Sequence, residues 1–500
     1  LAARRLPQAL REAAPPLPMY GGLRRALARY RDLAGHPAWS AKLPPLPARK
    51  LVEGQAWAGL AVLAQRLEAL GDLAPGYGVG ERFEGALAAA LQAFQDRHGL
   101  APDGVLGAAT LRELDVEPIA RVRQIELAME RLRWTPLLQA PRMVVVNVPE
   151  FVLRAYEVSG TRIDVRLVMK VIVGKSLRTR TPLLAQAMRF IEFSPYWNVP
   201  PSIAREEIVP RLRRDPGYLE REGFEFVTSS GQVVTALAAS HLDAVLRGGW
   251  RIRQRPGPQN ALGDIKFVFP NNANIYLHDT PARRLFERER RDFSHGCIRL
   301  EAPAALAQFV LRDEPAWTAD RIGEAMGAGV STTLRLRQPV PVLIAYSTVV
   351  ARAGTVYFYR DLYGHDAVLD RALRERAADL PELAAFLLKR LTGGQPVCRL
   401  DAEALAALKA HDFPGNVREL RNLLQRAVLT CRDGVIRAAD LHLPTVPAPT
   451  LPETQPLAEG ERSHIRALLV AHAGHRNRVA TALGITERTL YRKLKRYGLS

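Results

Sequence analysis

Cys297 and His278 are the two side chains of this chain whose types and spacing suit covalent catalysis. Cys297 stands in the string Phe293–Leu300, which reads Phe-Ser-His-Gly-Cys-Ile-Arg-Leu, and His278 ends an apolar, strand-like run upstream of it. Cysteine catalysis needs a thiolate, an imidazole that takes the thiol proton, and backbone N–H groups aimed at the oxygen that becomes negative. We therefore predict Cys297 as the nucleophile and His278 as its general base.

The residues just before Cys297 suit an oxyanion site. Gly296 has no Cβ, so the main chain can turn sharply beside the nucleophile and aim its amides at a substrate carbonyl. Ser294 and His295 shape the same turn. We expect the amides of Gly296 and Cys297 to be the donors to the developing oxyanion.

Three neighbouring residues are candidates for substrate binding, and each has a structural alternative. Arg299 can hold a substrate carboxylate or form an internal ion pair, while Tyr276 and Trp197 can line a substrate site or belong to the core. Asp279 follows His278 on a predicted strand and would point to the opposite face. The group that orients the imidazole therefore stays open.

The other two cysteines, Cys398 and Cys431, have no such surroundings. A lone Cys is more often a small buried hydrophobe than a nucleophile, and three cysteines without paired spacing indicate neither a disulfide framework nor a zinc site. We predict structural roles for both, and we expect no metal and no organic cofactor.

The segments around the site alternate with the period of two that is typical of β-strands. They predict a mostly β sandwich or barrel that carries the site on its strands. Residues 203–256 interrupt this pattern with charged, helical sequence, which is either a lid that excludes water from an acyl-transfer site or a surface insertion. The strand-like runs are Met143–Val148, Phe151–Tyr156, Arg166–Val171, Val340–Ile344 and Thr355–Phe358.

The string around Cys297, together with the upstream His278, resembles the signature of the L,D-transpeptidases, cysteine enzymes of peptidoglycan cross-linking. Residues 194–204 (Ser-Pro-Tyr-Trp-Asn-Val-Pro-Pro-Ser-Ile-Ala) and 256–263 (Pro-Gly-Pro-Gln-Asn-Ala-Leu-Gly) resemble blocks of the large form found in bacteria with an outer membrane. This resemblance extends to about residue 373. It implies a catalytic domain over residues 118–373, with residues 203–256 as a substrate-capping subdomain.

The same resemblance implies the reaction and its substrates, which are the peptide stems of peptidoglycan. Cys297 would attack the carbonyl between the third residue, usually meso-diaminopimelate, and the terminal D-Ala, and would release D-Ala from a thioester. An amine of a second stem would then take the acyl group. Acylation of Cys297 by carbapenems is also implied.

The residues before the catalytic domain read as small helices. Residues 51–117 resemble a three-helix peptidoglycan-binding module, through Phe94-Gln95, Gly99-Leu100, Asp103-Gly104 and Gly107. Those residues can equally hold the turns between helices. Residues 1–50 show helical periodicity between Pro-rich pieces and resemble a partial helical scaffold.

A different resemblance begins near residue 374. Residues 374–443 resemble the helical lid of the AAA+ domain of enhancer-binding transcription activators, through Phe413–Leu420. The sequence has no Gly-x-x-x-x-Gly-Lys-Ser/Thr phosphate loop, so we predict a structural role for Arg418 and no bound nucleotide. A Pro-rich linker follows at 444–458.

Residues 459–500 have the order of helix, Gly-containing turn and basic helix, which is typical of a helix-turn-helix. They resemble the Fis-type DNA-binding domain that ends the same activators. Nine Lys or Arg against three Glu fit phosphate contact, although a solvated basic face has the same composition. The candidate DNA-binding side chains are Arg488, Arg492, Lys493 and Arg496.

Composition agrees with a multidomain α+β protein. Its 500 residues suggest about three or four domains, and the net charge of +19 favours polyanionic partners without choosing among them. The longest apolar run is too short to span a membrane. Because the chain begins at Leu1 without a signal segment, we expect the natural N-terminus to lie upstream.

Two functions follow from these observations. The first is a periplasmic, wall-associated L,D-transpeptidase that acts through Cys297. The alternative is a cytoplasmic DNA-binding regulator whose transpeptidase portion is inactive or sensory, because a DNA reader and a wall enzyme work in different compartments.

Overall fold

The computed structural model describes residues 15, 17–135, 140–160, 162–176, 179–391, 398–411, 416–431, 433–441 and 443. The chain divides into two compact units, Leu1–Leu380 and Pro381–Ser500. The residues predicted to bind DNA, 488, 492, 493 and 496, lie outside the described residues. None of the helices in the described ranges has the length and apolar character needed to cross a bilayer.

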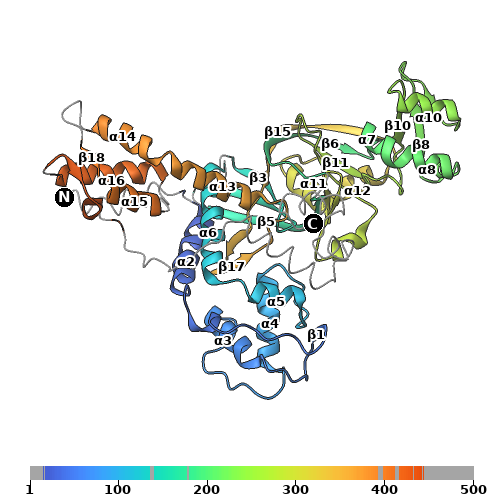
Figure 1. The fold of residues 1–500 in the computed structure, drawn as a ribbon. Coiled ribbons are helices and arrows are strands. Elements are labelled where there is room, and N and C mark those ends of the chain that lie inside the picture. The colour runs from blue at the N-terminus through green and yellow to red at the C-terminus, as the bar shows by residue number, and fades with distance from the viewer. Residues whose placement is uncertain are drawn as a thin grey trace, which may run out of the picture. The chain divides into compact units, whose positions relative to one another are not determined.

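The first unit begins with a helical body that contains its own core (Figure 1). Proline opens α2 and α6, where its missing N–H costs nothing, and Gly71 ends α3 in a left-handed conformation. The small β1–β2 pair joins Leu51 to Leu106. The elements are α2 (Pro18–Asp32), β1 (Lys50–Leu51), α3 (Leu60–Leu70), α4 (Ala86–Arg97), β2 (Leu106–Gly107), α5 (Ala108–Leu114) and α6 (Pro118–Trp134).

A hairpin from far along the chain completes this helical core. Strands β16 (Val349–Arg352) and β17 (Thr355–Phe358) pair with each other, and Phe358 packs edge-on against Tyr30 at 5.2 Å between ring centroids. The expectation that Thr355–Phe358 closes the catalytic sheet is therefore wrong. The apolar side chains of this hairpin fill the helical core instead.

The centre of the first unit is a nine-stranded sheet in the order β13-β5-β14-β12-β11-β6-β15-β3-β4, and an additional β4–β5 pairing curves it back on itself. Its buried residues form a second core, with α11 (Pro303–Leu311) and α12 (Ala319–Gly327) packed on it. The strands are β3 (Arg142–Asn147), β4 (Val152–Ser159), β5 (Arg162–Gly174), β6 (Leu184–Phe193), β11 (Ile265–Val268), β12 (Leu277–His278), β13 (Asp292–Ser294), β14 (Ile298–Leu300) and β15 (Thr332–Ala345).

The segment between β6 and β11 forms a separate lobe at the end of those strands (Figure 1). It has its own four-stranded sheet, in the order β7-β10-β8-β9, and its own apolar core. We call it the capping insertion. Its elements are β7 (Trp197–Asn198), α7 (Pro201–Ile203), the π-helical turn η2 (Ala204–Ile208), α8 (Val209–Arg214), α9 (Tyr218–Arg221), β8 (Phe224–Val227), β9 (Val233–Val234), α10 (Ala239–Leu246) and β10 (Arg251–Gln254).

The first unit ends with α13 (His365–Ala378), and the described part of the second unit is mainly helical. One short parallel pair, β18 with β19, joins Arg399 to Val435. Asp401 caps α15 by accepting a hydrogen bond from the Ala404 N–H. The elements are α14 (Leu380–Leu391), β18 (Arg399–Leu400), α15 (Ala402–Ala410), α16 (Asn416–Thr430), β19 (Val435–Ile436) and η4 (Ala438–Leu441). The whole is a multidomain α+β protein, as the sequence predicted.

Candidate active site

The predicted nucleophile, Cys297, directly precedes β14, which pairs in parallel with β12, the strand that ends at the predicted base, His278. His278 lies opposite Arg299 in register, and the Ile298 N–H donates to the Tyr276 carbonyl at 3.1 Å. Side chains alternate between the two faces of a sheet and paired residues share a face. Tyr276, His278, Cys297 and Arg299 therefore converge on one face.

The turn before Cys297 is held by the Ser294 hydroxyl. Its Oγ accepts from the Gly296 N–H at 3.1 Å and donates to the Cys297 carbonyl at 2.5 Å. Gly296 has φ +116°, where a side chain would be strained, and an added Cβ would lie 3.2 Å from Ile275 Cδ1. Because the Gly296 N–H donates to Ser294 Oγ in this geometry, its predicted role as an oxyanion donor would require that hydrogen bond to be exchanged. The Cys297 N–H has no partner among the described residues.

Two threonines between β5 and β6, which no sequence motif marks, support this turn. Thr179 Oγ1 donates to the Ser294 carbonyl at 2.9 Å, and Thr181 Oγ1 donates to the Gly296 carbonyl at 2.8 Å. Neither belongs to a sequence pattern that we recognised. Their role depends on β5 lying beside β13, which only the fold establishes.

His278 is a buried imidazole with a fixed tautomer. It is 4% exposed, and its Nδ1 lies 2.5 Å from the Asp279 carbonyl oxygen. A carbonyl only accepts, so Nδ1 carries the hydrogen and Nε2 is left as the acceptor. Burial, followed by the positive charge of Arg299, lowers the pKa of His278 to about 3. The ring is therefore neutral at pH near 7.

Asp279 contacts the His278 ring through its main-chain carbonyl and not through its carboxylate. The carboxylate accepts from the Asp264 N–H at 3.0 Å and pairs with Arg283. The side chain thus points away from the imidazole, as its strand position predicted. The orienting group that the sequence left open is the backbone carbonyl of Asp279 in this geometry.

Cys297 is a partly buried, neutral thiol in this structure. Its Sγ donates to the Asn274 carbonyl at 3.7 Å. Burial raises the pKa of Cys297, and a hydrogen bond from Tyr276 acts in the opposite direction. The resting site consequently holds a neutral thiol and a neutral imidazole, which can become an ion pair only when a proton moves between them.

Positive charge gathers on the same face. Arg299 Nε is buried and has no partner within the described residues, and burial lowers the pKa of this guanidinium. Lys266, which pairs in register with His278, places Nζ 4.6 Å from the Tyr276 ring centroid and 3.0 Å from Glu192 Oε2. Lys266 was not predicted as a site residue, although a Lys inside the apolar strand Ile265–Val268 was the available signal.

The capping insertion reaches the site through two residues. Trp197 on β7 lies close enough to Tyr276 to influence the pKa of that phenol, which burial raises, and Glu207 Oε1 lies 2.7 Å from His295 Nε2. Glu207 belongs to the π-helical turn Ala204–Ile208, a feature often found at functional sites. The sequence did not single out Glu207, because no motif marks it. His295 therefore faces the insertion.

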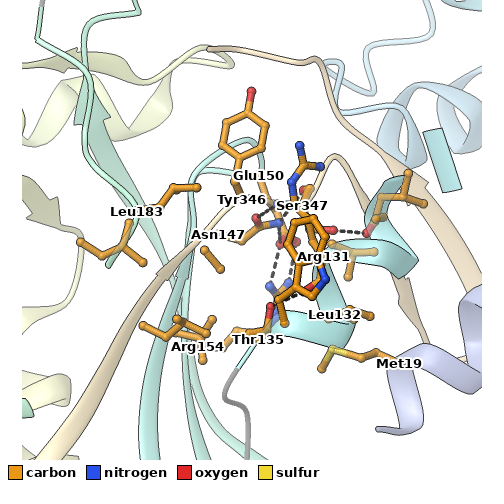
Figure 2. A pocket seen from close by; sticks show the side chains of 18 of the residues that line it. Met19, Arg131, Leu132, Thr135, Asn147, Glu150, Arg154, Leu183, Tyr346 and Ser347 are labelled. Carbon is orange, nitrogen blue, oxygen red and sulfur yellow. Dashed lines mark hydrogen bonds and ion pairs between the residues drawn. The ribbon is translucent and has the colours of Figure 1, made fainter. Parts of the chain in front are cut away.

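A separate cavity of about 410 Å³ lies between α2, α6 and the strands β3, β4 and β15. Figure 2 shows Glu150 at its centre, accepting from Arg154 at 2.6 and 2.7 Å and from Asn147 at 3.3 Å. Most of the remaining lining is aliphatic. It includes neither Cys297 nor His278, so we do not consider it the active site.

The site therefore combines a partly buried cysteine, a neutral histidine and an arginine whose Nε has no partner among the described residues. This arrangement is compatible with cysteine chemistry. Comparison with known families agrees with that chemistry. Residues 141–342 match the model of the L,D-transpeptidase catalytic domain, and residues 58–114 match the "Putative peptidoglycan binding domain". Residues 374–453 match the AAA+ ATPase lid domain, and residues 456–497 match the bacterial regulatory protein, Fis family.

The chain therefore joins an L,D-transpeptidase domain and a peptidoglycan-binding module to the lid and Fis-type helix-turn-helix of enhancer-binding activators. It is 32% identical over 247 residues to a Haemophilus influenzae "Putative L,D-transpeptidase", covering 49% of each chain. It is 37% identical over 169 residues to the Pseudomonas aeruginosa "Response regulator protein PilR", covering 31% of this chain and 38% of that protein. The chain thus spans about half the length, or less, of these curated relatives.

Among solved structures, NtrX from Brucella abortus in complex with ADP is 24% identical, covers 33% of this chain and 42% of that chain, and superposes with a TM-score of 0.14.

Proposed function

We propose that residues 118–373 catalyse L,D-transpeptidation of peptidoglycan stems, with Cys297 as nucleophile and His278 as general base. The observation that supports this proposal is the β12–β14 register, because Cys297 directly precedes β14 and its alternation with Arg299 turns it to the same face as His278. The module at 51–117 would hold the same polymer. Transpeptidation places this enzyme at the cell wall, in the periplasm.

The proposed reaction has two halves. In the first, the Cys297 thiol proton moves to His278 Nε2 as Sγ attacks the carbonyl of the third stem residue. The Cys297 N–H stabilises the oxyanion, and the proton then passes to the leaving amine of D-Ala. In the second, an acceptor amine loses a proton to His278 and attacks the thioester carbonyl, which frees the thiol.

Substrate binding makes His278 a stronger base in this scheme. After burial, the charge of Arg299 is the next cause of the low pKa of His278. A substrate carboxylate paired with the free Arg299 Nε would cancel that charge and raise the pKa of the imidazole. The empty enzyme therefore keeps its thiol protonated, and the bound stem activates it.

The capping insertion would exclude water from the thioester. Glu207 contacts His295 beside the nucleophile, while Trp197 and Tyr276 form one wall of the site. Exclusion of water favours the amine over hydrolysis as acyl acceptor.

Purified tetrapeptide stems test this proposal, with release of D-Ala and formation of stem dimers followed by mass spectrometry. Wild type should produce both, and Cys297→Ala and His278→Gln should lose them by about 10³-fold or more. Cys398→Ala, the same change outside the site, should match wild type. Release of D-Ala by Cys297→Ala at the wild-type rate would overturn the assignment.

A second candidate function, binding of DNA by residues 459–500, is favoured by the match of residues 456–497 to the Fis family. DNA binding would correspond to the alternative function of this chain as a cytoplasmic transcriptional regulator. Full-length protein should bind duplex DNA with an affinity that falls steeply with salt. Replacing Arg488, Arg492, Lys493 and Arg496 by Ala should weaken it about uniformly across sequences. Equal DNA affinity of this variant and wild type would show that these four residues do not contact DNA.

A further inference from the structure

The fold brings together the two cysteines for which the sequence predicted separate structural roles. Strand β18 pairs in parallel with β19, and the Arg399 N–H donates to the Gly434 carbonyl at 2.9 Å. Cys398 directly precedes β18, and Cys431 directly follows α16, whose last turn it caps through a 2.9 Å bond from its N–H to the Ala427 carbonyl. The backbone thus places both residues at the same end of this pair of strands.

The two thiols also influence each other. Burial, followed by the neighbouring Cys431 thiol, raises the pKa of Cys398. Both cysteines are free and partly exposed, so a small oxidant can reach them. Neighbouring accessible thiols are the requirement for forming a disulfide without large backbone movement.

We propose that Cys398 and Cys431 are a redox site that forms an intramolecular disulfide across the lid-like segment. With glutathione disulfide as oxidant, one cysteine thiolate attacks it and releases the first glutathione thiol. The second cysteine then attacks the mixed disulfide, forms the Sγ–Sγ bond and releases the second glutathione. Two protein S–H bonds are lost, two electrons pass to the oxidant, and two molecules of glutathione are formed.

The disulfide links the C-terminal end of α16 to the start of β18, closing a loop that contains α15 and α16. It stabilises this segment mainly by restricting its unfolded state. Disulfides persist in oxidising compartments and are reduced in the cytosol. The pair would therefore be oxidised in the periplasm, where the transpeptidase domain would work, and reduced in the cytoplasm, where the DNA-binding domain would work.

Peptide mapping of full-length protein equilibrated in glutathione buffers tests the inference. Free thiols are blocked with N-ethylmaleimide, and the unreduced protein is digested with trypsin. The expected product under oxidising conditions is peptide 391–399 linked to peptide 427–432, lost on reduction. The peptide that carries Cys297, residues 292–299, serves as internal control and should not join either of them.

Two variants complete the test. Cys398→Ser and Cys431→Ser should each leave the other cysteine blocked or glutathionylated, and should abolish the rise in melting temperature of the second unit that oxidation gives wild type. Three results would overturn the proposal. They are recovery of both wild-type peptides unlinked at every glutathione ratio, linkage only between two chains, and an unchanged rise in melting temperature in the variants.

Discussion

Replacing His278 tests whether the proposed base is a buried, neutral imidazole. The ring is 4% exposed, and its pKa falls from 6.5 to about 3, with burial as the largest cause. One pKa unit corresponds to about 1.4 kcal/mol, so protonating this ring in the fold costs about 5 kcal/mol. The unfolded chain binds the proton more readily, so the stability that His278 gives is complete above pH 6.5 and is lost as pH falls towards 3.

His278→Gln removes this dependence, because the amide does not titrate. Between about pH 7 and about pH 4.5, wild type should lose about 2.5 kcal/mol more unfolding free energy than the variant. His98 and His365, whose pKa values are also lowered by burial, remain in both proteins and cancel in the difference.

Urea unfolding followed by tryptophan fluorescence measures this difference in the first unit alone, because all six tryptophans lie in it. Cys297→Ala is the matched control, since it alters the same site and leaves the histidine, and it should keep the wild-type pH dependence. Parallel curves for wild type and His278→Gln would refute the reasoning, because they would mean that the folded protein protonates this ring as readily as the unfolded chain does.

Three further predictions follow from the contacts around the site. Gly174→Ala should cost about 2–4 kcal/mol of unfolding free energy, because the added Cβ would lie 1.9 Å from the Thr179 carbonyl oxygen. Gly107→Ala is the control, because Gly107 has open space around it and φ −97°. Equal losses of unfolding free energy in the two variants would contradict the predicted clash. Arg299→Gln should raise the pKa of His278 and move the acid limb of Cys297 acylation to higher pH, and an unmoved limb would exclude the charge coupling. Glu207→Gln should change the unfolding free energy by less than about 1 kcal/mol, since the ion pair of Glu207 with His295 is partly exposed. The variant should nevertheless increase hydrolysis of the acyl-enzyme. An unchanged ratio of amine transfer to hydrolysis would show that Glu207 does not help to exclude water.

The candidate site could be singled out from the sequence because its residues form short continuous motifs in the chain. The string around Cys297 and the strand that ends at His278 are each continuous, and the period of two assigns their shared face. The same reasoning assigned the direction of the Asp279 side chain. Fold class and the four-part composition of the chain were also predictable, since each part has its own pattern.

Contacts between distant segments could not be read from the sequence. Thr181, Glu207 and Lys266 reach the site through pairings and an insertion that no local pattern specifies. The strand Thr355–Phe358 was recognised, but its packing in the helical core depends on which apolar face it meets. The approach of Cys398 to Cys431 likewise depends on a two-residue strand pair, which sequence periodicity cannot detect.

Intact-mass spectrometry after exposure to a carbapenem tests the central claim, that Cys297 is an activated nucleophile. We expect one covalent adduct on wild type, its loss in Cys297→Ala, and its retention in Cys398→Ala and Cys431→Ala. An adduct-free wild-type protein that is folded by circular dichroism, or an adduct that persists in Cys297→Ala, would contradict it.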